Sequence, residues 1–141
     1  MMKNLLSLVT SAVICLIILL WILNYILSPK YNFEYYYSPD NKNVVTRIDH
    51  NGATYFTYGF YEENNIPDDY IQPIYSGINS GFEVILFWER DTAVIYAHYG
   101  RFDRSGKHPK LALRIYEGVG NDPLFYKMKK DSTGNYKVLH D

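Results

Sequence analysis

Apolar residues follow two different patterns along the chain. From Leu5 to Leu27 they form one run without a charged side chain, and after Tyr31 they occur in short stretches separated by turn-forming residues. A long continuous run predicts a helix, whereas short stretches bounded by glycine, proline and asparagine predict strands. The sequence therefore predicts two parts: an N-terminal helix in residues 1–29 and a domain of extended segments in residues 30–141.

The N-terminal run has the length of a membrane span. Its 23 residues would cover about 34 Å at a rise of about 1.5 Å per residue, against a hydrocarbon core of about 30 Å. Trp21 and Tyr25 lie one helical turn apart near its end, where aromatic residues occupy the membrane interface. Pro29 cannot continue the helix. We expect a single-pass signal anchor that contacts lipid through residues 5–27.

A cleaved leader is the alternative to an anchor. A secretory signal has an apolar segment of about 7 to 15 residues and a small-residue cleavage site, whereas this run is longer and is followed by no such site. A lipoprotein cut before Cys15 would follow the bulky Ile14, where such signals carry a small residue. Positive charges on both sides orient the run only weakly. The short N-terminal tail favours a domain on the extracytoplasmic side.

The rest of the chain predicts a mainly β domain. The strand candidates are Tyr31–Tyr37, Val44–Asp49, Ala53–Phe60, Phe82–Trp88, Thr92–Tyr99, Lys110–Glu117, Leu124–Met128 and Tyr136–Leu139. Asn51-Gly52 is the strongest hairpin signal, because both residues tolerate a positive φ. The fourth and fifth candidates predict a central hairpin, because they are apolar on both faces. We expect a small antiparallel β-barrel or sandwich, since closure or stacking protects strand edges.

One long segment interrupts the strands. Tyr61–Gly81 contains two prolines, two glycines, three asparagines and four carboxylates, and long loops in compact domains are often functional. The carboxylates lack the spacing of a calcium-binding loop. Tyrosine gives a large contact area at low conformational cost. The segment therefore predicts a surface for a protein partner, with these candidate residues: Tyr61, Asp68, Asp69, Tyr70 and Tyr75.

Composition limits the partners and cofactors. From Tyr31 onward, 12 lysines and arginines stand against 15 aspartates and glutamates, a net charge of about −3. This balance gives no electrostatic footprint for nucleic acid. The only cysteine, Cys15, lies in the anchor, so the domain has no disulfide and no cysteine-based zinc site. We expect no metal or cofactor and no nucleic-acid partner. The sequence does not indicate an oligomeric state.

The densest set of reactive side chains begins at His98. In a hydrolase His98 would be a general base oriented by Asp103, but no nucleophile at a strained turn accompanies this pair. A metal site formed by His98, Asp103 and His108 has no spacing that fixes its geometry. A strand end running into a charged loop also explains the composition. His98, Arg101 and Asp103 are kept as candidate contacts for an anion or another ligand.

These observations favour a non-enzymatic binding module at a bacterial-type membrane. We expect its β domain to face a protein partner, as a toxin-neutralising immunity protein does. One alternative is a membrane-tethered sensor that holds a small molecule in a pocket of the β domain, and a hydrolase using His98 is a third reading. A sensor requires an enclosed cavity with convergent polar groups, whereas a binding module requires a filled core and an exposed aromatic loop.

Overall fold

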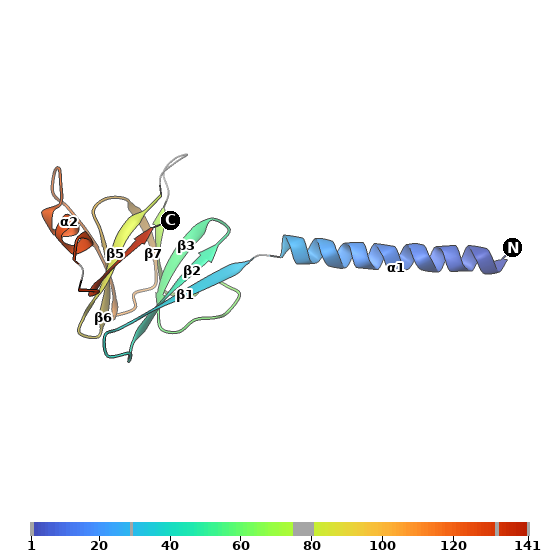
Figure 1. Ribbon diagram of the computed structural model, residues 1–141, viewed down its shortest axis with the longest axis horizontal. Helices are drawn as coiled ribbons and strands as arrows, with labels where there is room; N and C mark the ends of the chain where they lie inside the picture. The colour runs from blue at the N-terminus through green and yellow to red at the C-terminus, as the bar shows by residue number, and fades with distance from the viewer. Residues whose placement is uncertain (1, 29, 75–80, 132, 141) are drawn as a thin grey trace. The chain divides into compact units, whose positions relative to one another are not determined.

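The computed structural model describes residues 2–28, 30–74, 81–131 and 133–140, with the side chains of the N-terminal helix described from Ala12 onward (Figure 1). The chain divides into two compact units, Met1–Lys30 and Tyr31–Asp141. Each unit has its own internal contacts and is described by itself.

The first unit is the helix α1, Met2–Leu27. Its last turn is closed by Ser28, whose hydroxyl donates a hydrogen bond to the carbonyl oxygen of Asn24 at 2.6 Å. Among the residues that the structure describes, no helix has both the length and the apolar character needed to cross a membrane.

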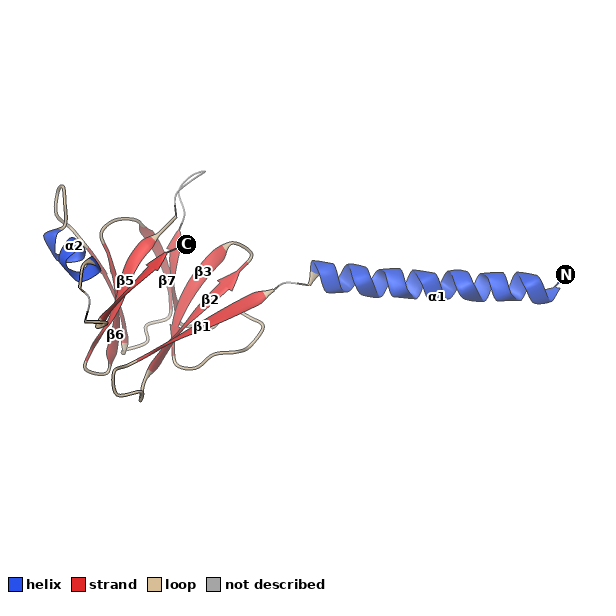
Figure 2. Cartoon of the chain, in the orientation of Figure 1, coloured by secondary structure: helices blue, strands red, loops and turns tan. Residues whose placement is uncertain are grey.

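The second unit is built mainly from strands (Figure 2). Within its described residues the elements are β1 Tyr31–Tyr37, β2 Val44–His50, β3 Ala53–Tyr58, β4 Tyr70–Ile74, β5 Glu83–Glu89, β6 Thr92–Ala97, β7 Arg101–Ser105, β8 Leu111–Ile115, α2 Pro123–Lys129 and β9 Tyr136–His140.

The strands form two sheets that pack face to face. The first sheet has the order β1-β2-β3-β4-β7 and the second has the order β8-β6-β5-β9. The mainly β prediction is confirmed, and of its two versions the barrel is wrong, because the sheets stay separate. The prediction of antiparallel pairing throughout is also wrong, since β8 runs parallel to β6. The chain crosses to the first sheet as β7 between these two strands, and such a crossover allows parallel pairing.

Local sequence determines the two main hairpins as expected. Asn51 and Gly52 have φ values of 50° and 76°, and they join β2 to β3 in a register that pairs His50 with Ala53. The predicted central hairpin joins β5 to β6 and pairs Leu86 with Ile95.

Residues at alternate positions of both sheets fill the space between them. This is the main core, and neighbouring residues on the same strands point outward because side chains alternate across a strand. Its buried members are Val45, Phe56, Ile71, Val84, Leu86, Ala93, Ile95, Ala97, Leu111 and Leu139.

The sequence missed three elements. β4 lies inside Tyr61–Gly81, which was expected to be a loop, and the charged β7 was also assigned to a loop. β4 contains Pro73, which normally argues against an interior strand. It is tolerated because β3 pairs with β4 only at Phe56 and Ile71. The expected strand Leu124–Met128 is part of the helix α2, which is too short to show a helical pattern.

Candidate functional site

The loop of residues 59–69 lies on the outer face of the first sheet. Thr46, buried on that face, donates its hydroxyl to the carbonyl of Gly59 at 2.6 Å and accepts the Tyr61 amide at 3.2 Å. At the other end of the loop, the hydroxyl of Thr57 donates to the carbonyl of Asp69 at 2.8 Å. These bonds use the loop's backbone, so the side chains between them are free to face solvent.

Aromatic and acidic side chains surround the first part of this loop. The Tyr35 ring stacks on Phe60 with centroids 4.8 Å apart, and its hydroxyl donates to Glu62 Oε1 at 3.0 Å. Burial raises the pKa of Tyr35, and the hydrogen bond to Glu62 raises it further. The hydroxyl of Tyr61 donates to Asn65. Phe60 is 59% exposed, so this corner offers an apolar ring beside a carboxylate.

A second aromatic and acidic group lies where β4 begins. Tyr70 meets Tyr55 edge to face at 5.2 Å, and its hydroxyl donates to Asp103 Oδ2 at 3.4 Å. Burial raises the pKa of Tyr70, as does the neighbouring Asp103. Asp69 contacts Gly106: a Cβ at that glycine would lie 1.4 Å from Asp69 Oδ1, and its φ of +63° also favours glycine.

Most of the predicted partner-binding residues therefore belong to one side of the first sheet. We call this side the acidic-aromatic face and define it by Tyr35, Phe60, Tyr61, Glu62, Glu63, Asp68, Asp69, Tyr70 and Asp103. Asp68 is exposed there, and the exposed Arg101 lies two residues before Asp103 on β7. Tyr75 lies outside the described residues.

His98 belongs to a different place, the outer face of the second sheet. Its ring is surrounded by four aromatic rings with centroid distances of 5.4 to 6.0 Å: Tyr99, Tyr116, Phe125 and Tyr126. Its Nδ1 atom is buried without a hydrogen-bond partner and lies 3.8 Å from Asp122 Oδ2. The carboxylate beside His98 is thus Asp122, whereas Asp103 contacts Tyr70 on the first sheet.

Asp122 is the residue that the sequence analysis missed. It is 1% exposed and is the N-cap of α2, accepting the amides of Leu124 and Phe125 at 3.0 Å each. It also accepts the Tyr96 hydroxyl at 2.7 Å. Burial alone would raise the pKa of Asp122, but the hydrogen bonds outweigh burial and hold it below its usual value. Asp followed by Pro123 is a helix-start signal that could have revealed this role.

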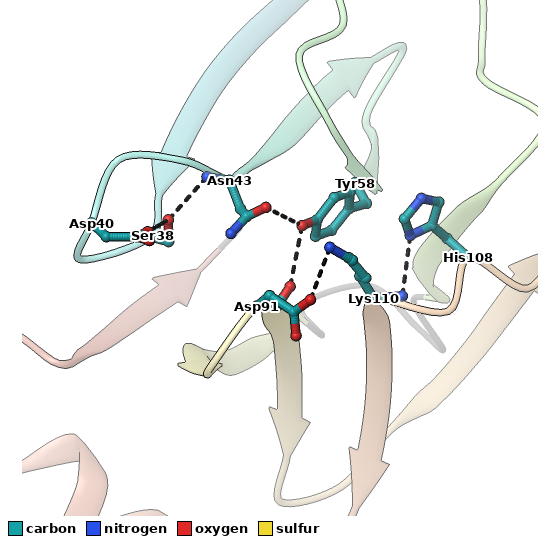
Figure 3. Close-up of polar contacts among 7 residues, drawn as sticks. All are labelled: Ser38, Asp40, Asn43, Tyr58, Asp91, His108 and Lys110. Carbon is teal, nitrogen blue, oxygen red and sulfur yellow. Dashed lines mark hydrogen bonds and ion pairs between the residues drawn. The ribbon is translucent and has the colours of Figure 1, made fainter.

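A polar network ties the two sheets together at one end (Figure 3). The hydroxyl of Tyr58, on β3, lies 2.7 Å from Oδ1 of Asn43, just before β2, and 3.1 Å from the carbonyl oxygen of Asp91, in the turn between β5 and β6 of the second sheet. Asp91 forms a 2.8 Å ion pair with Lys110, which lowers the pKa of Asp91. The His108 ring stacks on Tyr58 at 4.4 Å. Each of these side chains contacts another member of the network, which holds the two sheets together at this end.

The described residues contain no group of three metal-ligating side chains. The surface of the β domain has hollows in two places among the described residues. One, of about 420 Å³, lies beside α2 against Met128 and Tyr136, and the other, of about 230 Å³, lies beside β1. Both open to solvent.

The two expected interface residues share one face of α1. The rings of Trp21 and Tyr25 lie 6.3 Å apart and are close to parallel. They are 70% and 67% exposed.

Comparison with other proteins does not assign the chain to a family. It matches no protein-family model, no curated protein and no solved structure. Its function has to be inferred from its own surfaces.

Proposed function

We propose that this protein is a membrane-anchored, non-enzymatic binding module that presents its acidic-aromatic face to a protein partner. The observation that carries the proposal is the attachment of residues 59–69 through backbone hydrogen bonds to Thr46 and Thr57. This attachment orders the loop while leaving its aromatic and acidic side chains at the surface.

An ordered loop favours binding because its residues lose their conformational entropy when the protein folds, and not when the partner associates. Aromatic residues contribute most to interface energies, and Phe60 is exposed while Tyr61 and Tyr70 are partly exposed. Carboxylates around them would guide a basic partner by long-range attraction. A toxin with a basic surface is one such partner, which makes an immunity-type role consistent with this face.

The membrane part of the proposal rests on the sequence. The uncharged run begins at Leu5, before the first helix side chain that the structure describes, and it ends at Leu27. A run of this length spans the hydrocarbon core of a bilayer. Trp21 and Tyr25 would lie at its interface. In this proposal the β domain lies on the extracytoplasmic side of the membrane.

The partner-binding proposal is tested by cross-linking the full-length protein in its native cells, followed by purification and identification of the linked protein. The variant combines Phe60→Ser, Glu62→Gln and Asp68→Asn, three changes at exposed side chains. The matched control combines Val119→Ser and Leu124→Ser, exposed apolar residues outside this face. We expect the affinity for the identified partner to fall at least tenfold in the variant only. Equal binding by both variants would refute the assignment of the face.

The membrane proposal is tested by extracting membranes with alkaline carbonate. We expect the full-length chain, with residues 1–29 retained, to remain in the membrane pellet. Leu16→Arg replaces an apolar side chain with a charge near the middle of the run and costs about 3 to 4 kcal/mol of insertion free energy, so the share of this variant in the pellet should fall. A soluble mature chain that lacks its first thirty residues would overturn the anchor.

A further inference from the structure

β1 differs from the other three edge strands of the two sheets. β7, β8 and β9 are each five residues long, and they carry Arg101, Arg114 and Lys137 among their charges. β1 is seven residues long and, like the shorter β8, has a single charged side chain, Glu34, so it is the longest edge and the one with the lowest density of charge. Short, charged edges resist the addition of another strand, whereas a long, weakly charged edge permits it. β1 is therefore the edge most open to strand addition.

The pairing register shows which backbone groups of β1 are free. The Gly59 amide donates to the carbonyl of Val44, so the backbone of Val44 points towards β3. Because these directions alternate along a strand, Val45 points towards β1, where it pairs with Tyr36. The backbone amides and carbonyls of four residues therefore point away from the sheet: Tyr31, Phe33, Tyr35 and Tyr37.

A cleft of about 230 Å³ lies beside this free edge. Tyr36, Leu86 and Trp88 line it with apolar surface, and they also form or contact the main core. Asn135, just before β9, and Lys137, on β9, also line it. A strand added to β1 would direct every second side chain to the inner side of the sheet. Those side chains would enter this cleft.

The charge in the cleft is positive. Lys137 pairs with Leu86 in the register of β9 and β5, which puts both side chains on the inner side of the second sheet. Within the described part of the chain Lys137 forms no salt bridge. The acid of β1 does not neutralise it, because Glu34 accepts the Tyr36 hydroxyl and lies 3.9 Å from the Arg47 guanidinium. Lys137 is exposed, and an acidic group entering the cleft would form an ion pair with it.

We propose that β1 accepts an extended peptide segment as an additional strand of the first sheet, with an acidic side chain of that segment paired to Lys137 in the cleft. Main-chain hydrogen bonds to the free edge provide the affinity, and the cleft selects the inward side chain, as in other cases of strand addition. This site uses the backbone edge of β1, whereas the acidic-aromatic face uses side chains; Tyr35 belongs to both, through its backbone here and through its ring there.

The test uses the full-length protein in a mild detergent and two capped heptapeptides. One has the sequence Thr-Val-Thr-Asp-Thr-Val-Thr, and the other has lysine in place of aspartate. Amide chemical shifts should change at Tyr31, Phe33, Tyr35 and Tyr37 when the aspartate peptide is added. We expect it to bind at least fivefold more tightly than the lysine peptide. Lys137→Gln should abolish this preference.

A matched pair of variants distinguishes the contribution of the β1 backbone to peptide binding from that of its side chains. Phe33→Pro removes an amide that points away from the sheet, so the strand keeps its bonds to β2. Phe33→Ala removes the same ring and keeps the amide. We expect binding to be lost in Phe33→Pro and retained in Phe33→Ala, with both proteins folded by circular dichroism.

Three outcomes would overturn the proposal. They are the absence of binding by either peptide, shift changes confined to other strands, and shift changes at β1 that grow with protein concentration alone. The last result would show that a second copy of the chain occupies this edge.

Discussion

The two sheets have their outer faces covered in different ways. On the second sheet, α2 places Phe125 and Met128 against Ile85 and Tyr96, which makes a second apolar core. On the first sheet, residues 59–69 are held mainly through backbone bonds to threonine hydroxyls. Burying apolar side chains gives more stability than a few such bonds. The helix α2 therefore stabilises the fold by apolar burial, whereas the loop of residues 59–69 leaves most of its side chains at the surface.

The difference is also visible in the carboxylates of the two covers. Asp122, in the helical cover, is buried and accepts three hydrogen bonds. Asp68, in the loop cover, is exposed. A buried carboxylate with every partner in place is costly to change, whereas an exposed one is available to another molecule.

Removing the apolar contact of the helical cover should have the largest effect. Phe125 is 2% exposed, and Phe125→Ala should cost about 3 to 5 kcal/mol of unfolding free energy because it leaves a cavity. Urea denaturation measures the change. Leu124→Ala, on the exposed side of the same helix, should cost less than about 0.5 kcal/mol. Equal stability of the two variants would show that α2 does not form a core.

Removing the carboxylate that caps α2 should have the next largest effect on stability. Asp122→Ala removes the N-cap, worth about 1 kcal/mol, and leaves the buried Tyr96 hydroxyl without its acceptor, which costs about 1 to 3 kcal/mol more. Urea denaturation of this variant is compared with that of Asp68→Ala, which changes an exposed aspartate. A loss no larger than that of Asp68→Ala would contradict the role of Asp122.

Releasing the loop cover should cost less stability and change local dynamics. The double variant Thr46→Val and Thr57→Val keeps side-chain shape but removes hydroxyl bonds worth about 1 kcal/mol each. We expect faster hydrogen exchange at the Tyr61 amide while the core strands remain protected. Thr92→Val, on β6, is the control. Unchanged exchange at Tyr61 would show that these hydroxyls do not hold the loop.

Raising the pH should have the smallest effect on the stability of the fold. Burial and the hydrogen bond to Asp122 raise the pKa of Tyr96 from 10.0 to about 12. A pKa raised in the folded state stabilises the fold below pH 10, and this contribution is lost as pH rises through 12. The difference in stability between the wild type and Tyr96→Phe should therefore shrink from pH 9 to pH 12. A constant difference in urea denaturation would argue against the shift.

The sequence by itself determined the local parts of this protein. It predicted the first three strands, the Asn51-Gly52 hairpin and the central hairpin, because alternation and turn chemistry depend on neighbouring residues. It also selected Tyr61, Asp69, Tyr70 and Asp103, although not their position on one face. The expected anchor and protein partner remain predictions.

Only the tertiary structure decided which distant segments meet. It placed β4 and β7 in the first sheet, made β8 parallel to β6, and brought Asp122 to Tyr96 and His98, from which it is separated in the sequence. It also laid residues 59–69 over the outer face and left β1 as a free edge. These contacts depend on sheet order and on the burial of particular faces. A short pattern of residues does not encode them, because the partners in each contact are set by the packing of the whole domain.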